Sequence, residues 1–246
     1  GDLVRLMREK DKGVDLIRDF AAPLSLVVLT DMVGVPSADR AMIQRWGREL
    51  AGGLDPMVRS VGVVSAAAAS AAFAEYLLGR IDARKSGPPG MLAKLAATPG
   101  KLSTWELIAN VTAFLVIGRQ TTSNLIGNGM LALMRNPDQM AKLRKRPALI
   151  KSGLEELVRF DGPLHLTARA ADEDVKVGGT TVKAGEQVIP LLAAANCVPA
   201  PVPDPDRPEL TRAHHPRPAS RHRPPTCIPG THQRSSTPRA TPPHGH

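Results

Sequence analysis

Residues 103–135, STWELIANVTAFLVIGRQTTSNLIGNGMLALMR, carry a long helical pattern of apolar residues. Ser103 is followed three residues later by Glu106, which predicts a capping box at the start of a helix. The pattern continues to Met134, and Pro137 closes it. At 1.5 Å per residue such a helix would span roughly 45 Å, which is the width of a whole domain. We therefore expect one helix to run through the entire domain.

The centre of this helix is polar, with the sequence Gly118-Arg119-Gln120-Thr121-Thr122-Ser123-Asn124 between mostly apolar residues. Polar groups in the middle of an apolar helix are costly unless they have a role. The same stretch makes a membrane-spanning helix unfavourable, because it would lie at the middle of the bilayer. The alternative to a functional role is that these residues form a surface patch, whose hydroxyls bond to carbonyls one turn earlier.

The rest of the pattern predicts a mainly α fold with a small β region. Helical spacing recurs before and after the long helix, over residues 14–35 with a break at Pro23, 41–51, 57–84, and 142–160 with an interruption near Pro147. After Pro163 the period becomes alternating. Residues 175–182 predict a hairpin through Gly178-Gly179, and residues 188–192 predict a buried strand.

Two further groups of residues are candidates for a role. Glu156 and Arg159 lie three residues apart, so they share one face of a helix and can form an ion pair. Because this spacing is common, the pattern alone indicates a pair on the protein surface. In the alternating segment, Leu164 and Leu166 point to one side and Arg169 to the other. One of these sides could face a ligand.

Composition divides the chain into two parts. The net charge is +9, but residues 211–246 contain six Arg and no Lys, Asp or Glu, which leaves +3 for the first 210 residues. Thirteen of the 23 prolines and six of the seven histidines lie in the last 49 residues, where periodicity vanishes. We therefore expect a domain over residues 1–210 and a disordered basic tail over residues 211–246.

Cysteine use and the absence of a signal peptide favour a cytoplasmic protein. Cys197 and Cys227 are too few for a disulfide framework, and no amino-terminal stretch has the pattern of a cleavable leader. The histidines of the tail fit no structural zinc pattern. The chain begins at Gly1, inside an apparent amphipathic helix, so we expect that residues upstream are missing.

Taken in order, five segments resemble the bacterial cytochromes P450 over roughly residues 14–212. Residues 117–122, IGRQTT, are similar to the oxygen-activating motif of the family, in which a small residue and Gly precede an acid-Thr-Thr element. Residues 155–163, EELVRFDGP, resemble the family's Glu-x-x-Arg helix. The strand 166–169, the hairpin with the turn 184–186, and the meander containing Asn196 and residues 203–207 follow in the family's order.

This resemblance implies a haem-dependent monooxygenase that inserts one oxygen atom from O2 into an apolar small molecule. It implies haem b as the cofactor, with Cys227 as the iron ligand and Arg169 paired with a propionate. Gly118 would let the helix approach the macrocycle, and Thr121 would hold water or dioxygen beside the iron. A ferredoxin-type protein would donate the electrons, and we expect neither a membrane nor a nucleic acid as a partner.

The resemblance also implies roles in structure and in substrate binding. Glu156 and Arg159 would join the core helix to the meander. Leu164 and Leu166 would border an apolar substrate pocket.

Three departures from the family pattern bear on activity. Gln120 stands where the family has an acid, and an amide cannot ionise to deliver protons. The amino-terminal region of the family, which supplies strands and part of the pocket, is missing. Cys227 is preceded by Ser-Arg-His-Arg-Pro-Pro-Thr, without the Phe and glycines of the family's ligand loop. We expect a shift of reading frame between Asn196 and Ala219 to explain this tail.

Two other functions remain open on the sequence. The chain could be a non-catalytic remnant that binds no haem. It could also be a helical domain whose basic tail binds nucleic acid, because six arginines lie in that tail.

Overall fold

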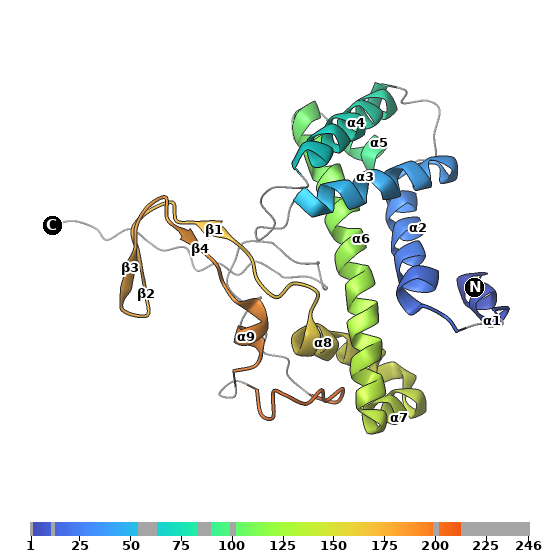
Figure 1. Ribbon diagram of the computed structural model, residues 1–246, viewed down its shortest axis with the longest axis vertical. Helices are drawn as coiled ribbons and strands as arrows, with labels where there is room; N and C mark the ends of the chain where they lie inside the picture. Colours follow the sequence, from blue (N-terminus) through green and yellow to red (C-terminus); the bar gives the residue numbers. More distant parts are fainter. Residues whose placement is uncertain are drawn as a thin grey trace.

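The computed structural model of the chain shows most helices packed around one long central helix (Figure 1). It describes residues 2–10, 13–53, 63–82, 90–98, 102–198 and 202–212. The α-helices are α1 (Asp2–Arg8), α2 (Ala22–Val33), α3 (Arg40–Gly53), α4 (Val63–Asp82), α5 (Met91–Ala96), α6 (Thr104–Arg135), α7 (Pro137–Lys145), α8 (Ile150–Asp161) and α9 (Leu192–Asn196). Single turns of other helix types lie at η1 (Ile17–Ala21), η2 (Ser37–Asp39) and η3 (Pro147–Leu149), and the strands are β1 (Arg169–Ala170), β2 (Val175–Val177), β3 (Thr180–Val182) and β4 (Gln187–Val188).

The long helix predicted from the sequence is α6, and its capping box is confirmed. The backbone N–H of Glu106 donates to Ser103 Oγ at 3.2 Å, and the backbone N–H of Ser103 donates to the Glu106 carboxylate at 2.8 Å. Helix α2 packs along the side of α6, α4 and α5 pack near its beginning, and α7 and α8 pack near its end (Figure 1). The helix thus connects two hydrophobic cores.

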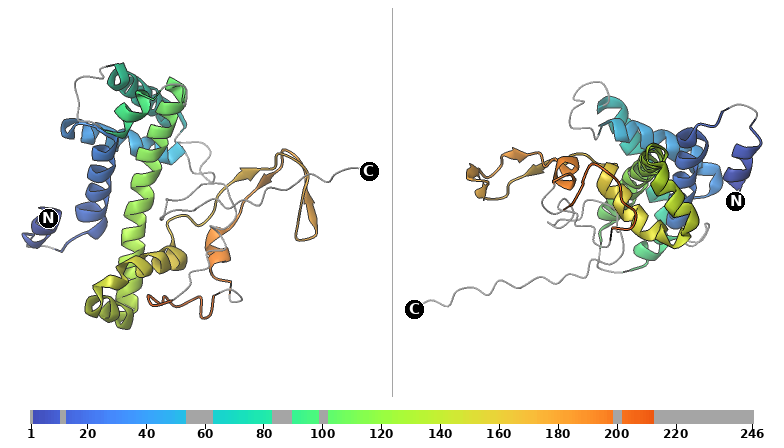
Figure 2. Two further views of the ribbon diagram at one scale, coloured as in Figure 1. Left: turned by 180° about the vertical axis from the view of Figure 1, so that it is seen from behind. Right: turned by 90° about the horizontal axis from the view of Figure 1, so that it is seen from below.

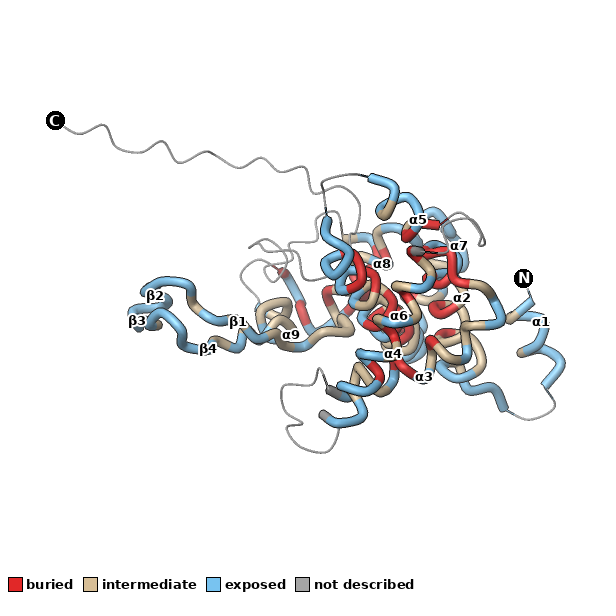
Figure 3. The backbone as a smooth tube through the Cα atoms, turned by 90° about the horizontal axis from the view of Figure 1, so that it is seen from above, coloured by how far each residue is buried: buried red, intermediate tan, exposed pale blue. Residues whose placement is uncertain are grey.

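The larger core joins α6 to the helices that precede it. Phe73 and Leu77 of α4 and Val111 of α6 are fully buried there. The buried members of this core are Leu26, Leu29, Val33, Val35, Ile43, Trp46, Ala69, Phe73, Leu77, Ile81, Leu92, Leu107, Ile108, Val111, Leu115 and Val116. Figure 3 shows the buried residues gathered around α6, whereas the β region is mostly exposed.

The smaller core lies at the carboxyl end of α6. It consists of Ala132 and Leu133 from α6, Leu157 from α8, and Leu210 from the last described segment. Leu210 is fully buried, and a Cβ atom added at Gly153 of α8 would lie 3.3 Å from its side chain. This core therefore holds residues 202–212 against α7 and α8.

The β region confirms the predicted hairpin. Strands β2 and β3 pair antiparallel, with Val175 opposite Val182. Gly178 and Gly179 form the two-residue turn with φ values of 56° and 86°, which glycine adopts at little cost. The hairpin projects away from the helices (Figure 2).

The buried strand expected over residues 188–192 is not present. The strand β4 contains only Gln187 and Val188, and it pairs with β1. Ile189 is 48% exposed and Leu191 is 59% exposed. An apolar run predicts burial only where another layer covers it, and this ribbon has two strands.

Two other expectations concern helix boundaries and the chain's end. Pro23 does not break the helical region, because η1 runs directly into α2 and Pro23 lies in the first turn, where its missing N–H is not needed. The tail after Arg212, with Cys227, lies outside the described residues. In the part of the chain that the structure describes, no helix is long and apolar enough to cross a membrane.

Candidate functional site

The middle of α6 carries the polar residues that the sequence singled out, and three of them are buried. Arg119, Thr121 and Ser123 are 6%, 5% and 3% exposed, whereas Gln120 is exposed. The hydroxyl of Thr121 donates to the Ile117 carbonyl at 2.9 Å, and the hydroxyl of Ser123 donates to the Arg119 carbonyl at 2.9 Å. The expected bonds to the preceding turn are therefore present. A surface patch is the wrong description for these three residues.

Gly118 lies at the contact between α6 and α2. A Cβ atom added there would lie 3.3 Å from Leu29 Cδ1, which is tighter than ordinary contact. Nearby, Ser123 Oγ and Ser25 Oγ are 3.2 Å apart and hydrogen-bonded. Gly118 therefore allows α2 to pack closely on α6. An approach of the macrocycle at this glycine remains a prediction.

A different face of α6 is exposed at the same level. Ala113, Ile117 and Gln120 recur at helical spacing on this face, and Ile117 is 46% exposed. The Gln120 amide nitrogen donates to Asn124 Oδ1 at 3.1 Å. This face therefore combines an apolar surface with a pair of neutral amides. A bound molecule on α6 would meet Ile117 and Gln120 first.

Sequence reasoning missed the importance of Ile117. This residue stands where the motif that it resembles has a small residue. Its exposed, branched side chain stands one turn before Gln120, so this face carries more bulk than a small residue would give it. The sequence did contain this signal, because Ile117 occupies the first position of the motif, where the family has a small residue.

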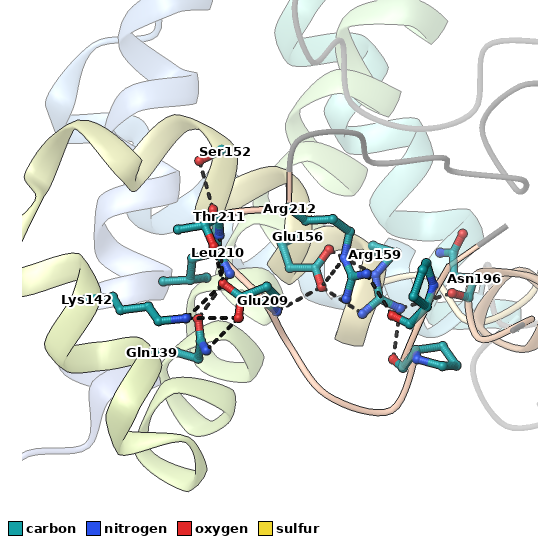
Figure 4. A network of polar contacts seen from close by, with 12 residues as sticks. Gln139, Lys142, Ser152, Glu156, Arg159, Asn196, Glu209, Leu210, Thr211 and Arg212 are labelled. Carbon is teal, nitrogen blue, oxygen red and sulfur yellow. Dashed lines mark hydrogen bonds and ion pairs between the residues drawn. The ribbon is translucent and has the colours of Figure 1, made fainter.

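The Glu156–Arg159 pair is fully buried, with both side chains at 0% exposure, so its interpretation as a surface pair is wrong (Figure 4). Arg159 Nε and Nη2 donate to the two carboxylate oxygens of Glu156 at 3.0 and 2.9 Å. Arg159 Nη1 also donates to the carbonyls of Asn196 and Pro205 at 3.1 and 3.0 Å. One guanidinium thus connects α8 to the segment after α9, which is the structural contact that the resemblance implied.

Arg212 is a third member of this network, and sequence reasoning missed it. Its Nε donates to Glu156 Oε1 at 3.2 Å, and its Nη1 donates to the Pro203 carbonyl at 2.8 Å. Burial raises the pKa of Glu156, but the hydrogen bonds from Arg159 and its neighbours outweigh this effect and lower the pKa overall. No local pattern pointed to Arg212, because its partner lies 56 residues earlier in the chain.

Glu209 forms a second polar contact between this segment and α7. It accepts hydrogen bonds from Lys142 Nζ at 2.9 Å and Gln139 Nε2 at 3.1 Å. Gln139 is fully buried and accepts the backbone N–H of Leu210 at 3.1 Å. Figure 4 shows this group beside the Glu156 network.

We expect the stability of the chain to fall between about pH 4.5 and pH 2 because of Glu209. Burial raises the pKa of Glu209, but bonds from Thr211, Lys142 and Gln139 outweigh it and lower the pKa from 4.5 to about 2. In this window the unfolded chain binds the proton more readily, so acid favours unfolding. Urea denaturation at several pH values measures how the free energy of unfolding changes with pH. Glu209→Gln should make this dependence weaker, and an unchanged dependence would contradict this assignment.

The remaining candidate residues lie on the segment that leads from α8 to the β region. Leu164, Leu166 and Arg169 are partly buried, and Leu166 forms an isolated bridge with Leu191. Arg169 begins β1 and pairs with Val188 of β4. The predicted strand is therefore short, with two residues in β1 and one isolated bridge at Leu166. Roles for Arg169 with a propionate and for both leucines with a substrate remain predictions.

One exposed face of α6 has the apolar character that a flat cofactor needs. This face, at Ala113 and Ile117, lies beside the buried residue Thr121. Arg169, the predicted partner of a propionate, is partly buried at the start of β1. Cys227, the predicted iron ligand, lies outside the described residues. In the described part of the chain, no three His, Cys, Asp or Glu side chains gather as a metal site.

Comparison with curated proteins identifies bacterial relatives. The biotin biosynthesis cytochrome P450 of Bacillus subtilis is 35% identical over 222 residues, which is 88% of this chain and 56% of that protein. Cytochrome P450 107B1 of Saccharopolyspora erythraea is 39% identical over 205 residues, covering 81% of this chain and 49% of that protein. The chain thus spans about half the length of the curated relatives that it matches. No protein-family model matches it.

Solved structures agree with this assignment. The crystal structure of CalO2 superposes with a TM-score of 0.80 at 30% identity, over 89% of this chain and 55% of that one. P450BioI, solved in complex with an acyl carrier protein carrying a fatty acid, gives a TM-score of 0.78 at 34% identity, over 88% of this chain and 56% of that one. Over the residues that it shares with these proteins, the chain therefore belongs to the cytochrome P450 family.

Proposed function

We propose that this protein is a haem-dependent monooxygenase that inserts one oxygen atom from O2 into an apolar small molecule. The observation that supports this most is the match to cytochromes P450 over 88% of the chain in both sequence and fold. In that fold, residues 117–122 lie at the centre of the longest helix. The exposed apolar face beside Thr121 supports the proposal, because an apolar molecule could bind against it.

The proposed cofactor is haem b, which would supply the activation of oxygen when bound. Cys227 would provide the thiolate that holds the iron, and Arg169 would pair with a propionate. Ile117 and Gly118 would lie against one face of the ring. Leu164 and Leu166 would border the pocket for the apolar substrate.

Thr121 and Gln120 would position a proton donor at this site. The Thr121 hydroxyl donates to the Ile117 carbonyl, so its oxygen is left to accept a hydrogen bond from a water. Gln120 would orient that water through its amide, which is itself held by Asn124. A ferredoxin-type protein is the proposed electron donor, and the cytoplasm is the proposed location.

The experiment that tests this function is an absorption spectrum of the purified chain with added haem, reduced and exposed to carbon monoxide. We expect a red-shifted Soret band typical of thiolate ligation. It should disappear in Cys227→Ala and persist in Cys197→Ala, the matched control at the other cysteine. No bound haem, or a band that survives in Cys227→Ala, would reject the proposed ligand and favour a remnant without haem chemistry.

Replacing Gln120 with Glu should raise the rate of donor-dependent oxygen consumption by the haem-loaded chain about tenfold or more, because general acid catalysis contributes at least this much. An ionisable group would then stand where the present amide cannot release a proton. Gln120→Met, which cannot donate a hydrogen bond, should lower the rate. Oxygen-electrode traces of the three proteins provide the measurement. Equal rates for Glu and Gln would show that residue 120 delivers no proton.

A further inference from the structure

Arg119 is a buried guanidinium at the contact between α6 and α3. Its side chain is 6% exposed, and its Nε is completely buried without a hydrogen-bond partner. A Cβ atom added at Gly47 of α3 would lie 3.9 Å from this Nε. The arginine side chain therefore packs against α3 at a glycine, which has no side chain of its own. Within the described ranges, no carboxylate forms an ion pair with it.

The residues around Arg119 increase the free-energy cost of burying its charge. Burial and the neighbouring charge of Arg48 both lower the pKa of Arg119, yet a guanidinium stays protonated at neutral pH. Ser123, one turn later on the same helix, bonds to Ser25 and to the Arg119 carbonyl, and not to the guanidinium. Buried charges in proteins are normally paired. Among the described residues, no acidic side chain compensates this buried charge.

We propose that Arg119, together with Arg48, forms a binding site for a small oxyanion of the carboxylate class between α3 and α6. The planar fork of a guanidinium matches the two oxygens of a carboxylate, which makes such pairs strong and specific. No described residue accepts a hydrogen bond from the Nη atoms, so we assign the oxyanion to this end of the guanidinium. Exposed Arg48 would attract the anion from solution.

This site is distinct from the proposed oxygen chemistry. Ile117 and Gln120 occupy the exposed face of α6, whereas Arg119 is buried against α3. Arg119 follows Ile117 by two residues, which is about 200° around a helix, so these two side chains lie on opposite sides of α6. The proposal therefore holds whether or not the chain binds haem.

The test is thermal unfolding of the full chain in rising concentrations of sodium acetate, with ionic strength held constant by sodium HEPES. A ligand of the folded state raises the unfolding midpoint with its concentration. We expect such a rise in the unmodified chain and in Arg45→Met, an exposed arginine of α3. The rise should be lost in Arg119→Met, which keeps the length of the side chain without its charge.

A second measurement covers the case in which Arg119→Met does not fold. Calorimetric titration of acetate should show one site on the unmodified chain and weaker binding to Arg119→Lys, which keeps the charge without the fork. No acetate response in the unmodified chain would overturn the proposal. The proposal would also be overturned if acetate raised the unfolding midpoint of Arg119→Met as much as that of the unmodified chain. The same holds if Arg119→Lys bound acetate as tightly as the unmodified chain.

Discussion

Replacing Arg159 with Met should lower the free energy of unfolding by about 3–5 kcal/mol, because breaking a buried ion pair is strongly destabilising. Glu156 would keep only the single contact with Arg212 as an ion pair. Both Arg159 and Glu156 are at 0% exposure, and Arg159 also satisfies the carbonyls of Asn196 and Pro205. The substitution therefore also frees the segment that Arg159 holds against α8. Urea denaturation followed by circular dichroism measures the change.

The matched control is Arg207→Met, in the same segment. Arg207 pairs with Asp138 at 2.8 Å, but its side chain is 55% exposed, so this substitution should cost less than about 1 kcal/mol. Adding Glu156→Leu to Arg159→Met should not recover the loss, because Arg212 and the backbone N–H of Glu209 would then lose their acceptor. If Arg159→Met costs no more than Arg207→Met, the buried pair does not stabilise the fold.

Replacing Phe73 with Ala should lower the free energy of unfolding by about 3–5 kcal/mol, because it leaves a cavity in a packed core. Phe73 of α4 is fully buried, and its ring centroid lies 5.5 Å from that of Trp46 of α3. Aromatic residues are few in this chain, with four Phe, two Trp and one Tyr. Trp46 also lies 5.9 Å from the ring of Tyr76 of α4, so the packing of α3 on α4 depends on a small aromatic cluster centred on Trp46.

Val64→Ala is the control on the same helix. Val64 is 83% exposed, so its truncation should change stability by about 0.5 kcal/mol or less. Phe73→Leu, which retains most of the buried volume, should fall between the two. A loss for Phe73→Ala that matches Val64→Ala would show that α4 does not contribute to the core.

Local patterns were sufficient to predict elements whose signals lie within a few residues. The capping box of α6 joins Ser103 to a residue three positions later, and both hydrogen bonds are present. The hairpin needed only two glycines between alternating residues, and its turn has the positive φ values that glycine permits. The order of motifs was likewise enough to indicate the family.

Burial could not be predicted in this way. The spacing of Glu156 and Arg159 indicated a surface pair, but Asn196 and residues 202–212 cover them. Conversely, the apolar run at 188–192 indicated a buried strand, but no second layer packs on it. In both cases the outcome depends on a segment far away in the chain, which local periodicity does not reveal.

The sequence by itself determined the helical class, the extent of α6, the hairpin and the membership of a family, because each depends on local propensities or on the order of short motifs. Only the tertiary structure decided which polar residues are buried and what they contact. It placed Gly118 against Leu29, Arg119 against α3, and Arg212 on Glu156. The physical reason is that burial and ion pairing are set by long-range packing, and this chain brings residues 56 positions apart together at one carboxylate.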